Sequence, residues 1–548
     1  MAIVPTAFEQ LVEAYYREWW RLFPSSGSRA GVYDCDAELE VPTWELIESR
    51  SKQITDTASA VGELKRPSTD TPAELDRMVF EAHLAVADLR LRTIQTWRRD
   101  PSLPLTEAIE SLFELLARRD LSNSETVRAI ARRLSRVPEF LKAARERIDD
   151  PVGLWVTIAE ESIEGSIEFV RNAVVPLGAE HQALQPELAA AGQKSVDAIR
   201  SYGDWLAKLR QRPLNEDFAV GPESLHQIIK HWHGLNVSPA DVEESGWSLI
   251  QYFQDELEQQ VQRIDREATW AEVLQRARKE FAQRDHDILT DYRMVTDALR
   301  ERMSTDEFLD LPSDETCKVV ATPAFLRAII PSAAYSSPGP LDPHQIGLFF
   351  VTEPDRSLGD EAYRANLGQH YGIDSTCVHE AYPGHHVQLC WANRAGSRSR
   401  QMADHIIFME GWTLYCEQMM VEQGWVGPSE LRLLRLNYLA DQLWRAYRMV
   451  IDVGIHTRTL SVAAAVRMLI DGVGFTRERA ETELNWYTQS PGVPMSYLLG
   501  KRETLALRDQ FMKGRGATLK RFHRWLLSFG SVPQRWLHPH LPIEATST

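Results

Sequence analysis

The sequence has no excess of basic residues and no long apolar run, and these two absences exclude two classes of partner. Lysine and arginine together number 61, against 78 aspartate and glutamate residues, so the formal net charge is −17. Nucleic-acid binding requires a dense basic face, which this balance disfavours. Crossing a bilayer requires about 20 consecutive apolar residues, whereas the longest apolar runs here, such as residues 346–351, have the length of a strand. We therefore expect no nucleic-acid partner and no membrane partner.

Cysteine is scarce as well. Five cysteines occur in 548 residues, and no two of them form a Cys-x-x-Cys pair, which excludes a disulfide framework and a thiolate zinc site. The first residues lack the basic and apolar regions of a signal peptide. Glycine and proline, at 29 and 28 residues, are not enriched enough for a collagen-like or low-complexity chain. These features predict a cytoplasmic globular protein.

Most of the chain carries the signals of α-helices. Capping patterns occur at residues 71–74 (TPAE), 122–125 (SNSE) and 238–241 (SPAD), each with a side chain suited to cap a helix N-terminus. Between these signals, apolar residues recur at intervals of three and four, as between residues 109 and 116. The pattern predicts a mainly α fold.

Two short segments in the middle of the chain depart from the helical pattern. Residues 317–321 and 346–352 are apolar and are rich in β-branched or aromatic side chains, and proline and glycine lie between them. Such segments are typical of strands. We expect them to form a small β-ribbon just ahead of the richest motif, where an edge strand could pair with an extended substrate backbone.

The strongest motif is HEAYPGHHVQ at residues 379–388. It opens like the zinc-hydrolase motif His-Glu-x-x-His, in which two histidines one helical turn apart bind zinc and the glutamate acts on the metal-bound water. Here Pro383 stands where the second histidine would be. In a continuous helix the next histidines would lie roughly 9–10 Å along the axis from His379, too far to share one ion.

The helix must therefore break for this motif to bind a metal, and the sequence contains a helix breaker. Pro383 cannot donate the helical hydrogen bond, and Gly384 permits backbone angles closed to other residues. A bulge of two residues would place His385 where the second histidine belongs, and a bulge of three would place His386 there. We favour His379 and His385 as ligands, with His386 behind the metal or facing the substrate.

A third ligand is expected from residues 409–417. Glu410 and Glu417 are both candidates, and Glu410 is favoured because Gly411 lets another backbone approach closely. Two histidines, one glutamate and an open position for water form the ligand set of a catalytic zinc. We expect one Zn²⁺ per chain, and Fe²⁺ is the alternative because the same three ligand types hold iron in oxygenases.

These residues also carry a resemblance to a known family. The motif, followed by EGWTLYCE at residues 410–417 and RAYRMVIDVGIH at residues 445–456, resembles the bacterial family catalogued as domain of unknown function 885 (DUF885). That family is regarded as α-helical zinc hydrolases or peptidases, distantly similar to the gluzincin peptidases. The resemblance implies the same three ligands and Glu380 as general base. The chain departs from the family pattern at Trp486 and Val493, in segments expected to be substrate-contacting loops.

The matched segments supply further candidates for the site. A tetrahedral oxyanion needs a hydrogen-bond donor besides the metal, and His456 and Tyr497 are the candidates. Arg445 or Arg448 could bind a substrate carboxylate as a two-pronged fork, which would suit a carboxypeptidase or dipeptidase.

Each of these candidates also has a structural alternative. The two arginines share one helical face with His456 and could belong to a solvated ion-pair ladder. Tyr497 could be an ordinary core tyrosine. His386 is a further candidate for substrate binding.

Taken together, the sequence predicts one α-helical domain over residues 1–548, with a helical part to about residue 310 and a metal-site part beyond it. We expect a large helical body, of one or two lobes, around a deep channel with the β-ribbon beside the metal. The predicted function is zinc-dependent hydrolysis of an amide bond in a small peptide or peptide-like metabolite, with Glu380 as general base. The alternatives are a non-haem iron enzyme and a catalytically inactive binding protein. The net charge favours neutral or basic small substrates, and nothing in the sequence indicates an oligomeric state.

Overall fold

The computed structural model describes residues 5–305, 308–322, 327, 330, 332–425 and 428–542. Helices make up most of the described chain and three short strands form one sheet, which confirms the mainly α prediction. All five cysteines are free. Among the described helices, none combines the length and the apolar character needed to cross a bilayer.

The first fourteen helices are α1 (Ala7–Leu22), α2 (Pro24–Ala30), α3 (Trp44–Glu63), α4 (Pro72–Asp88), α5 (Thr96–Arg99), α6 (Leu103–Arg118), α7 (Ser124–Arg147), α8 (Gly153–Phe169), α9 (Leu177–Glu180), α10 (Gln185–Leu209), α11 (Gly221–Gln227), α12 (Pro239–Gln262), α13 (Trp270–Gln283) and α14 (Ile288–Thr305). The strands are β1 (Glu315–Ala321), β2 (Ala333–Ser336) and β3 (Gln345–Val351). The remaining α-helices are α15 (Asp360–Gly368), α16 (Ile373–Glu380), α17 (His385–Ala392), α18 (Arg398–Gln401), α19 (Ile406–Glu422), α20 (Pro428–Thr457), α21 (Val462–Val473), α22 (Arg477–Gln489), α23 (Val493–Phe511) and α24 (Leu519–Leu527). Short 3₁₀ or π-helical turns lie at η1 (Tyr33–Cys35), η2 (Leu89–Ile94), η3 (Val170–Val174), η4 (Gln182–Leu184), η5 (Ile228–Trp232), η7 (Arg356–Leu358) and η8 (Gln534–His540).

Two of the predicted helix caps are confirmed. The Thr71 side chain accepts the backbone N–H of Glu74 at the start of α4. Ser238 and Asp241 form a reciprocal capping box at the start of α12. Both caps satisfy backbone donors that the first turn of a helix leaves free.

The cap of α7 lies one residue later than predicted. Asn123, and not Ser122, accepts the backbone N–H of Glu125, at 2.9 Å. The Ser122 hydroxyl instead donates to the Asp120 carboxylate at 2.7 Å. A local side-chain contact therefore competed with the cap and moved the helix start by one residue.

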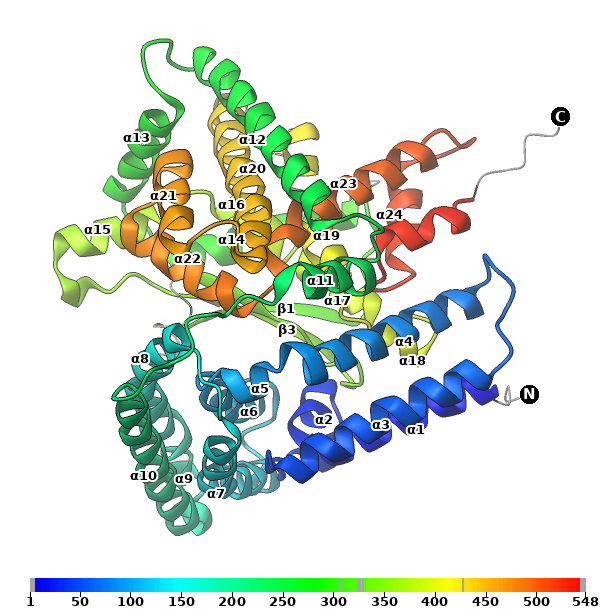
Figure 1. The fold of residues 1–548 in the computed structure, drawn as a ribbon. Coiled ribbons are helices and arrows are strands. Elements are labelled where there is room, and N and C mark those ends of the chain that lie inside the picture. The colour runs from blue at the N-terminus through cyan, green and yellow to red at the C-terminus, as the bar shows by residue number, and fades with distance from the viewer. Residues whose placement is uncertain are drawn as a thin grey trace.

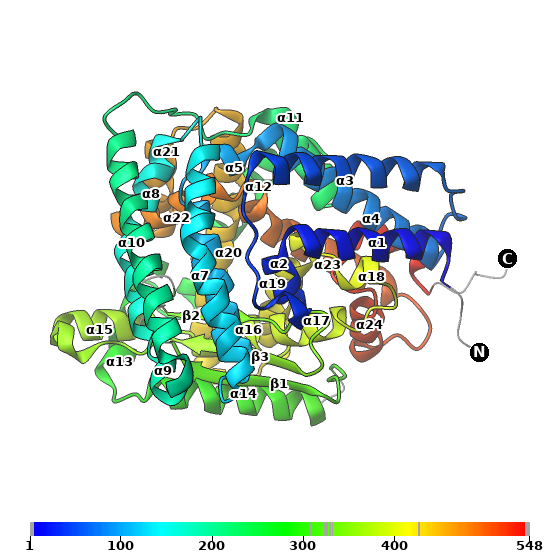
Figure 2. The same ribbon diagram turned by 90° about the horizontal axis from the view of Figure 1, so that it is seen from below.

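The helices divide into two small groups on one side of a larger body (Figures 1 and 2). Helices α6, α7, α8 and α10 enclose one apolar core, and α1, α3 and α4 enclose another. The larger body has two cores of its own, one around the sheet with α14, α16 and α19, and one between α12 and α20 to α23. Helices α12 and α14 thus precede residue 310 but pack in the same cores as the metal-site segment, so the packing does not follow the predicted division near that residue.

The predicted β-ribbon is a three-stranded mixed sheet in the order β1–β3–β2. Strands β1 and β3, which the sequence predicted within one or two residues, run parallel, from Glu315 opposite Gln345 to Ala321 opposite Val351. Strand β2, which was not predicted, pairs antiparallel with the other edge of β3. Parallel neighbours require a long crossover, and the chain between β1 and β3 provides it and contributes β2.

Buried neutral histidines tie several of these helices together. The His523 ring on α24 is fully buried, donates from Nδ1 to the carbonyl of Phe308 at 2.7 Å, and accepts the Tyr415 hydroxyl at Nε2, also at 2.7 Å. Burial lowers the pKa of His523 to about 4. Protonation would add a buried charge and would remove the acceptor that Tyr415 uses.

We expect these histidines to make the protein acid-sensitive. Between pH 6.5 and 4 the unfolded chain protonates His523 while the folded chain does not, so the free energy of unfolding falls as the pH falls through this window. The contribution reaches about 1.4 kcal/mol per pH unit for one group. Denaturant unfolding of the wild type and of His523→Asn at several pH values checks this. The variant should be less stable at pH 8 but should have a shallower pH dependence, and an equal slope in both proteins would contradict the assignment.

Candidate metal centre

The turn between α16 and α17 interrupts the helix inside the HEAYPGHHVQ motif. Helix α16 ends at Glu380 and α17 begins at His385. A Cβ atom added to Gly384 would lie 1.8 Å from the carbonyl oxygen of His379 and 2.3 Å from that of Val378. The backbone at Gly384 therefore packs directly against the last turn of α16, where only glycine fits. The predicted helix break is confirmed, and it brings the start of α17 back to His379.

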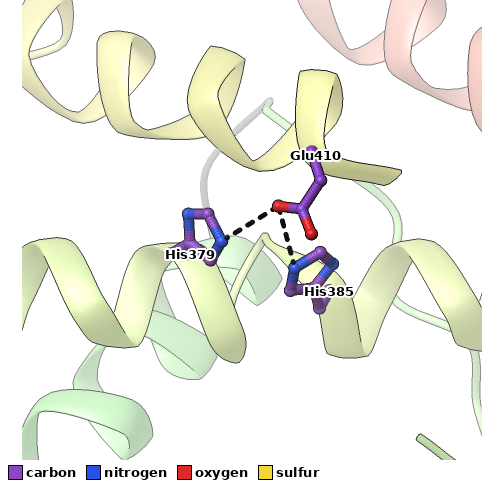
Figure 3. A group of neighbouring side chains, drawn as sticks. All are labelled: His379, His385 and Glu410. Atoms are coloured by element: carbon purple, nitrogen blue, oxygen red, sulfur yellow. Dashed lines mark ion pairs between the residues drawn. The ribbon is translucent and has the colours of Figure 1, made fainter. Parts of the chain in front are cut away.

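This turn places His379 and His385 around one point with Glu410, which projects from α19 (Figure 3). The Nε2 atoms of the two histidines lie 3.5 and 3.6 Å from Oε2 of Glu410. The three ligand atoms all lie within 4.8 Å of one another. Ligands at zinc bond lengths of about 2.0–2.2 Å in tetrahedral geometry are about 3.4 Å apart, so the spacing fits one ion.

The Glu410 carboxylate gives a second reason to expect a cation here. Its Oε2 atom is buried and has no hydrogen-bond partner among the described residues. Burial alone would raise the pKa of Glu410, but the charges of and contacts with His385 and His379 hold it well below its usual range. An ionised, buried and unpartnered oxygen that faces two imidazole nitrogens is a fitting metal ligand.

Glu417, the other candidate ligand, lies behind His379. Its Oε1 atom accepts the Nδ1–H of His379 at 2.7 Å. This contact leaves the lone pair on Nε2, the atom that faces Glu410, and so orients the ring for metal binding. Burial alone would lower the pKa of His379, but its contacts with Glu410 and Glu417 raise it to about 10 in the absence of an ion.

The position of Glu410 depends on close packing between α19 and α23. A Cβ atom on Gly411 would lie 2.3 Å from the carbonyl carbon of Gly500, and one on Gly500 would lie 1.8 Å from the carbonyl oxygen of Ile407. The two backbones therefore touch, as the glycine at 411 led us to expect. The contact also places Tyr497, one turn before Gly500, beside the helix turn that carries Glu410.

His386 does not face the substrate side of this cluster. Its ring is fully buried, with Nε2 donating to Glu315 at 2.7 Å and Nδ1 within hydrogen-bond distance of the Tyr335 hydroxyl at 2.8 Å. Both nitrogens are therefore occupied by the sheet. The prediction that His386 binds substrate does not agree with this geometry, because consecutive residues at a helix start point to different sides.

Glu315 is an important residue that the sequence reasoning missed. Its buried carboxylate accepts hydrogen bonds from His386, from Tyr382 at 2.5 Å and from Arg300 at 3.0 Å. Burial alone would raise the pKa of Glu315, but the hydrogen bonds from His386 and Tyr382 lower it. The residue ties β1 to the turn that carries His385. The sequence did contain a signal for this residue. Glu315 precedes Cys317 by two residues and Val319 by four, so the three side chains lie on the same face of a strand.

His456 also lies away from the cluster. Its ring is fully buried and its Nε2–H donates to the carbonyl of Tyr487 at 3.0 Å. One turn earlier on α20, Asp452 accepts the backbone N–H groups of Gly492 and Met495, at 3.2 and 3.1 Å. These contacts hold the corner between α22 and α23. The Nε2–H of His456 is therefore bound to a carbonyl inside the fold. The prediction that His456 donates a hydrogen bond to the oxyanion does not agree with this structure.

Tyr497 and Glu380 do lie at the cluster. Tyr497 is half-buried, and burial together with the charges of Glu410 and Glu380 raises its pKa well above the usual range, whereas Arg448 lowers it. The phenol therefore keeps its proton at neutral pH. Glu380 is the last residue of α16, next to His379 in the chain, and is also half-buried.

Arg445 and Arg448, the two candidates for binding a substrate carboxylate, lie on α20 and stack on Trp444. Their guanidinium carbons are 4.1 Å (Arg445) and 4.0 Å (Arg448) from the centre of that ring. Arg448 also contacts Trp486, at 5.1 Å. Trp486 and Val493 belong to α22 and α23, so the loops expected at these positions are helices.

We expect the turn at Gly384 to be intolerant of any side chain. Gly384→Ala should cost at least about 1–3 kcal/mol in unfolding free energy, because a Cβ would overlap the carbonyl of His379, and it should lower metal content. Gly165→Ala is the matched control, because that position in α8 has no neighbouring atom within 4 Å of a new Cβ. Denaturant unfolding and elemental analysis of both variants give the measurement. Wild-type stability and metal content in Gly384→Ala would contradict the packing.

Comparisons with known proteins agree with the fold and leave the activity open. The chain is similar in structure to a candidate lipoprotein of unknown function from Shewanella oneidensis, with a TM-score of 0.76 and 20% identity over 98% of this chain and 100% of that one. It is also similar to a candidate lipoprotein from Colwellia psychrerythraea, with a TM-score of 0.79 and 18% identity over 97% and 98% of the two chains. No curated protein matches the sequence. The family model described as bacterial protein of unknown function (DUF885) matches residues 24–541, and the chain belongs to that family.

Proposed function

We propose that the protein is a zinc-dependent hydrolase that cleaves an amide bond in a small peptide or peptide-like metabolite. The observation that carries the proposal is the convergence of His379, His385 and Glu410, with Glu380 next to the first ligand. Two histidines and one glutamate leave a coordination position free for water, which is typical of catalytic zinc. A structural zinc would instead be closed by four protein ligands.

The chain's own residues supply the proton transfers of such a reaction. Zinc bound by these ligands would lower the pKa of a coordinated water and polarise a substrate carbonyl. The Glu380 carboxylate accepts the proton of the attacking water and then donates it to the leaving amine. Tyr497, protonated at neutral pH, can donate a hydrogen bond to the oxyanion. With His456 used elsewhere, Tyr497 is the favoured donor.

Two alternatives are less well supported by the same residues. An iron oxygenase would use the three ligands but would have no need for Glu380 as a base. A catalytically inactive binding protein would not be expected to retain the ligands, Glu380 and the supporting Glu417 contact together. A peptidase of the gluzincin type, acting as a carboxypeptidase or dipeptidase, is the subclass that we favour.

The cytoplasmic location stays a prediction. The two similar structures belong to proteins described as candidate lipoproteins, a description that favours membrane attachment for those proteins. Fractionation of the native cells, with detection of this chain, decides between the compartments.

Metal analysis of the purified protein is the first test. We expect one equivalent of zinc, lost in His379→Ala and in Glu410→Ala. Glu417→Gln should weaken zinc affinity by about 10–100-fold, because it perturbs the hydrogen bond that orients His379. Glu422→Gln, an exposed position farther along α19, is the control and should bind zinc normally. Wild-type protein that takes up no zinc would overturn the proposal, and one equivalent of iron in its place would favour the oxygenase.

The role of Glu380 gives a second test. Glu380→Gln should keep its zinc and lose about 10²–10⁴-fold in turnover, because the amide cannot accept the proton. Release of free amine from a panel of dipeptides and N-acylated amino acids measures turnover. A zinc-loaded variant with full activity would show that another group is the base.

A further inference from the structure

Three arginines gather around one tryptophan beside the candidate metal centre. Their guanidinium carbons lie 4.1 Å (Arg445), 4.0 Å (Arg448) and 5.2 Å (Arg479) from the ring centre of Trp444. Arginine stacks favourably on an indole face. A cluster of this kind stands out in a chain whose net charge is −17, because it creates a local cationic region in an acidic protein.

The carboxylates around this cluster do not neutralise it. Glu483 pairs with Arg448 at 3.1 Å, and Asp441 lies 3.6 Å from Nη1 of Arg445. For Arg479, no carboxylate of the described residues lies within 4 Å. Glu483 and Asp441 are therefore shared among three guanidinium groups, and only Arg448 and Arg445 have one of these carboxylates within 4 Å.

Arg448 donates its hydrogen bonds to other residues of the protein. Its Nε donates to the Tyr487 hydroxyl at 3.0 Å, and its Nη2 donates to Glu483 at 3.1 Å. The side chain is 6% exposed. It cannot offer a two-pronged fork to a substrate without breaking these buried contacts, so its role is to support the cluster.

Arg445 has the opposite character. Its side chain is 12% exposed, and its Nε and Nη1 atoms are buried with no hydrogen-bond partner among the described residues. A buried donor without a partner is destabilising, and more so when it is charged. The 3.6 Å approach of Asp441 is too long for a hydrogen bond. A carboxylate from outside the protein could accept from one of these donors together with the neighbouring Nη2, since each pair forms one fork of the guanidinium group.

Tyr497 connects Arg445 to the candidate metal centre. The guanidinium carbon of Arg445 lies 6.0 Å from the centre of the Tyr497 ring. The same tyrosine lies beside the turn of α19 that carries Glu410, because α19 and α23 touch at Gly411 and Gly500. A small molecule that reaches from the metal centre to Arg445 would therefore pass along the Tyr497 ring.

We propose that Arg445 binds a free carboxylate of the substrate, so that the enzyme acts on small anionic peptides or N-acylated amino acids that carry a terminal carboxylate. The inference rests on the proposed hydrolase function, whose substrate class it names. It differs from the expectation drawn from net charge, because three arginines gather at this point of an otherwise acidic chain. Of the two arginines that the sequence suggested, Arg445 is the carboxylate-binding residue and Arg448 is a positioning residue.

The alternative is that Arg445 only forms a structural ion pair with Asp441. The two explanations predict different effects of Asp441→Asn. If Arg445 binds a ligand carboxylate, removing the competing anion should keep or strengthen ligand binding. If the pair is only structural, no carboxylate-specific binding exists to be strengthened, and Asp441→Asn changes stability alone.

Binding of 3-phenylpropanoate to the full-length protein tests the proposal, with 3-phenylpropan-1-ol as the neutral control ligand. Calorimetry and tryptophan fluorescence are measured on the protein as purified and after treatment with a chelator, which removes direct binding of the carboxylate to a metal. We expect the carboxylate to bind at least about tenfold more tightly than the alcohol in both samples, because the arginine fork recognises the charge.

The variants assign the effect to one residue. Arg445→Gln should weaken carboxylate binding about tenfold and leave the alcohol unchanged, and Arg445→Lys should weaken it less, because lysine keeps the charge but not the fork. Arg435→Gln is the matched control on the same helix, where Arg435 pairs with Glu256 at 3.4 Å. Circular dichroism confirms folding, and Arg445→Lys provides the test if Arg445→Gln does not fold.

Three results would overturn the proposal: no measurable carboxylate binding to the wild type at millimolar concentration, equal binding of the acid and the alcohol, or wild-type binding by the folded Arg445 variants. Failure of the hydrolase function has a different signature. In that case the protein would take up no zinc and release no amine, while carboxylate binding and its dependence on Arg445 would persist in the chelator-treated sample.

Discussion

The contact between Gly384 and the last turn of α16 is the constraint on which the candidate site depends. Two histidines six residues apart on one helix cannot reach the same ion. The chain solves this by ending α16 at Glu380 and starting α17 at His385, with the intervening backbone pressed against the carbonyl of His379. A side chain at residue 384 would separate the two helix ends. The geometry of the candidate site therefore depends first on backbone packing and only then on the chemistry of the three side chains.

Buried carboxylates hold the histidines of this turn in their orientations. Glu417 contacts the back of His379, and Glu315 contacts His386, the neighbour of His385. A buried histidine keeps one rotamer and one tautomer when its outer nitrogen donates to a carboxylate. The two glutamates come from different elements, α19 and β1, so the helix and the sheet hold the motif from two sides. Through Glu315 the small sheet thus contributes to holding the motif.

Charge is distributed unevenly around the centre. His379, His385 and Glu410 form a cluster suited to a cation, whereas three arginines lie around Trp444. Tyr497 stands between the two regions and is influenced by both, since Glu410 raises its pKa and Arg448 lowers it. A substrate with a polarised amide at one end and a carboxylate at the other would match this division. Net charge alone gave the opposite expectation, because it averages over a surface that the site does not share.

The sequence by itself determined the features that depend on neighbouring residues. The caps at Thr71 and Ser238 and the break at Pro383 and Gly384 follow from contacts within a few residues, which the order of amino acids specifies directly. Only the tertiary structure decided which distant surfaces meet. It placed His385 and Glu410 beside His379 and Glu417 behind that ring, paired β1 with β3 in parallel, and turned His386 and His456 into the fold. It also left Nε and Nη1 of Arg445 without a hydrogen-bond partner, whereas Arg448 donates to Tyr487 and Glu483. These outcomes depend on how separate helices pack, and no local pattern in the sequence encodes the partner that each face will meet.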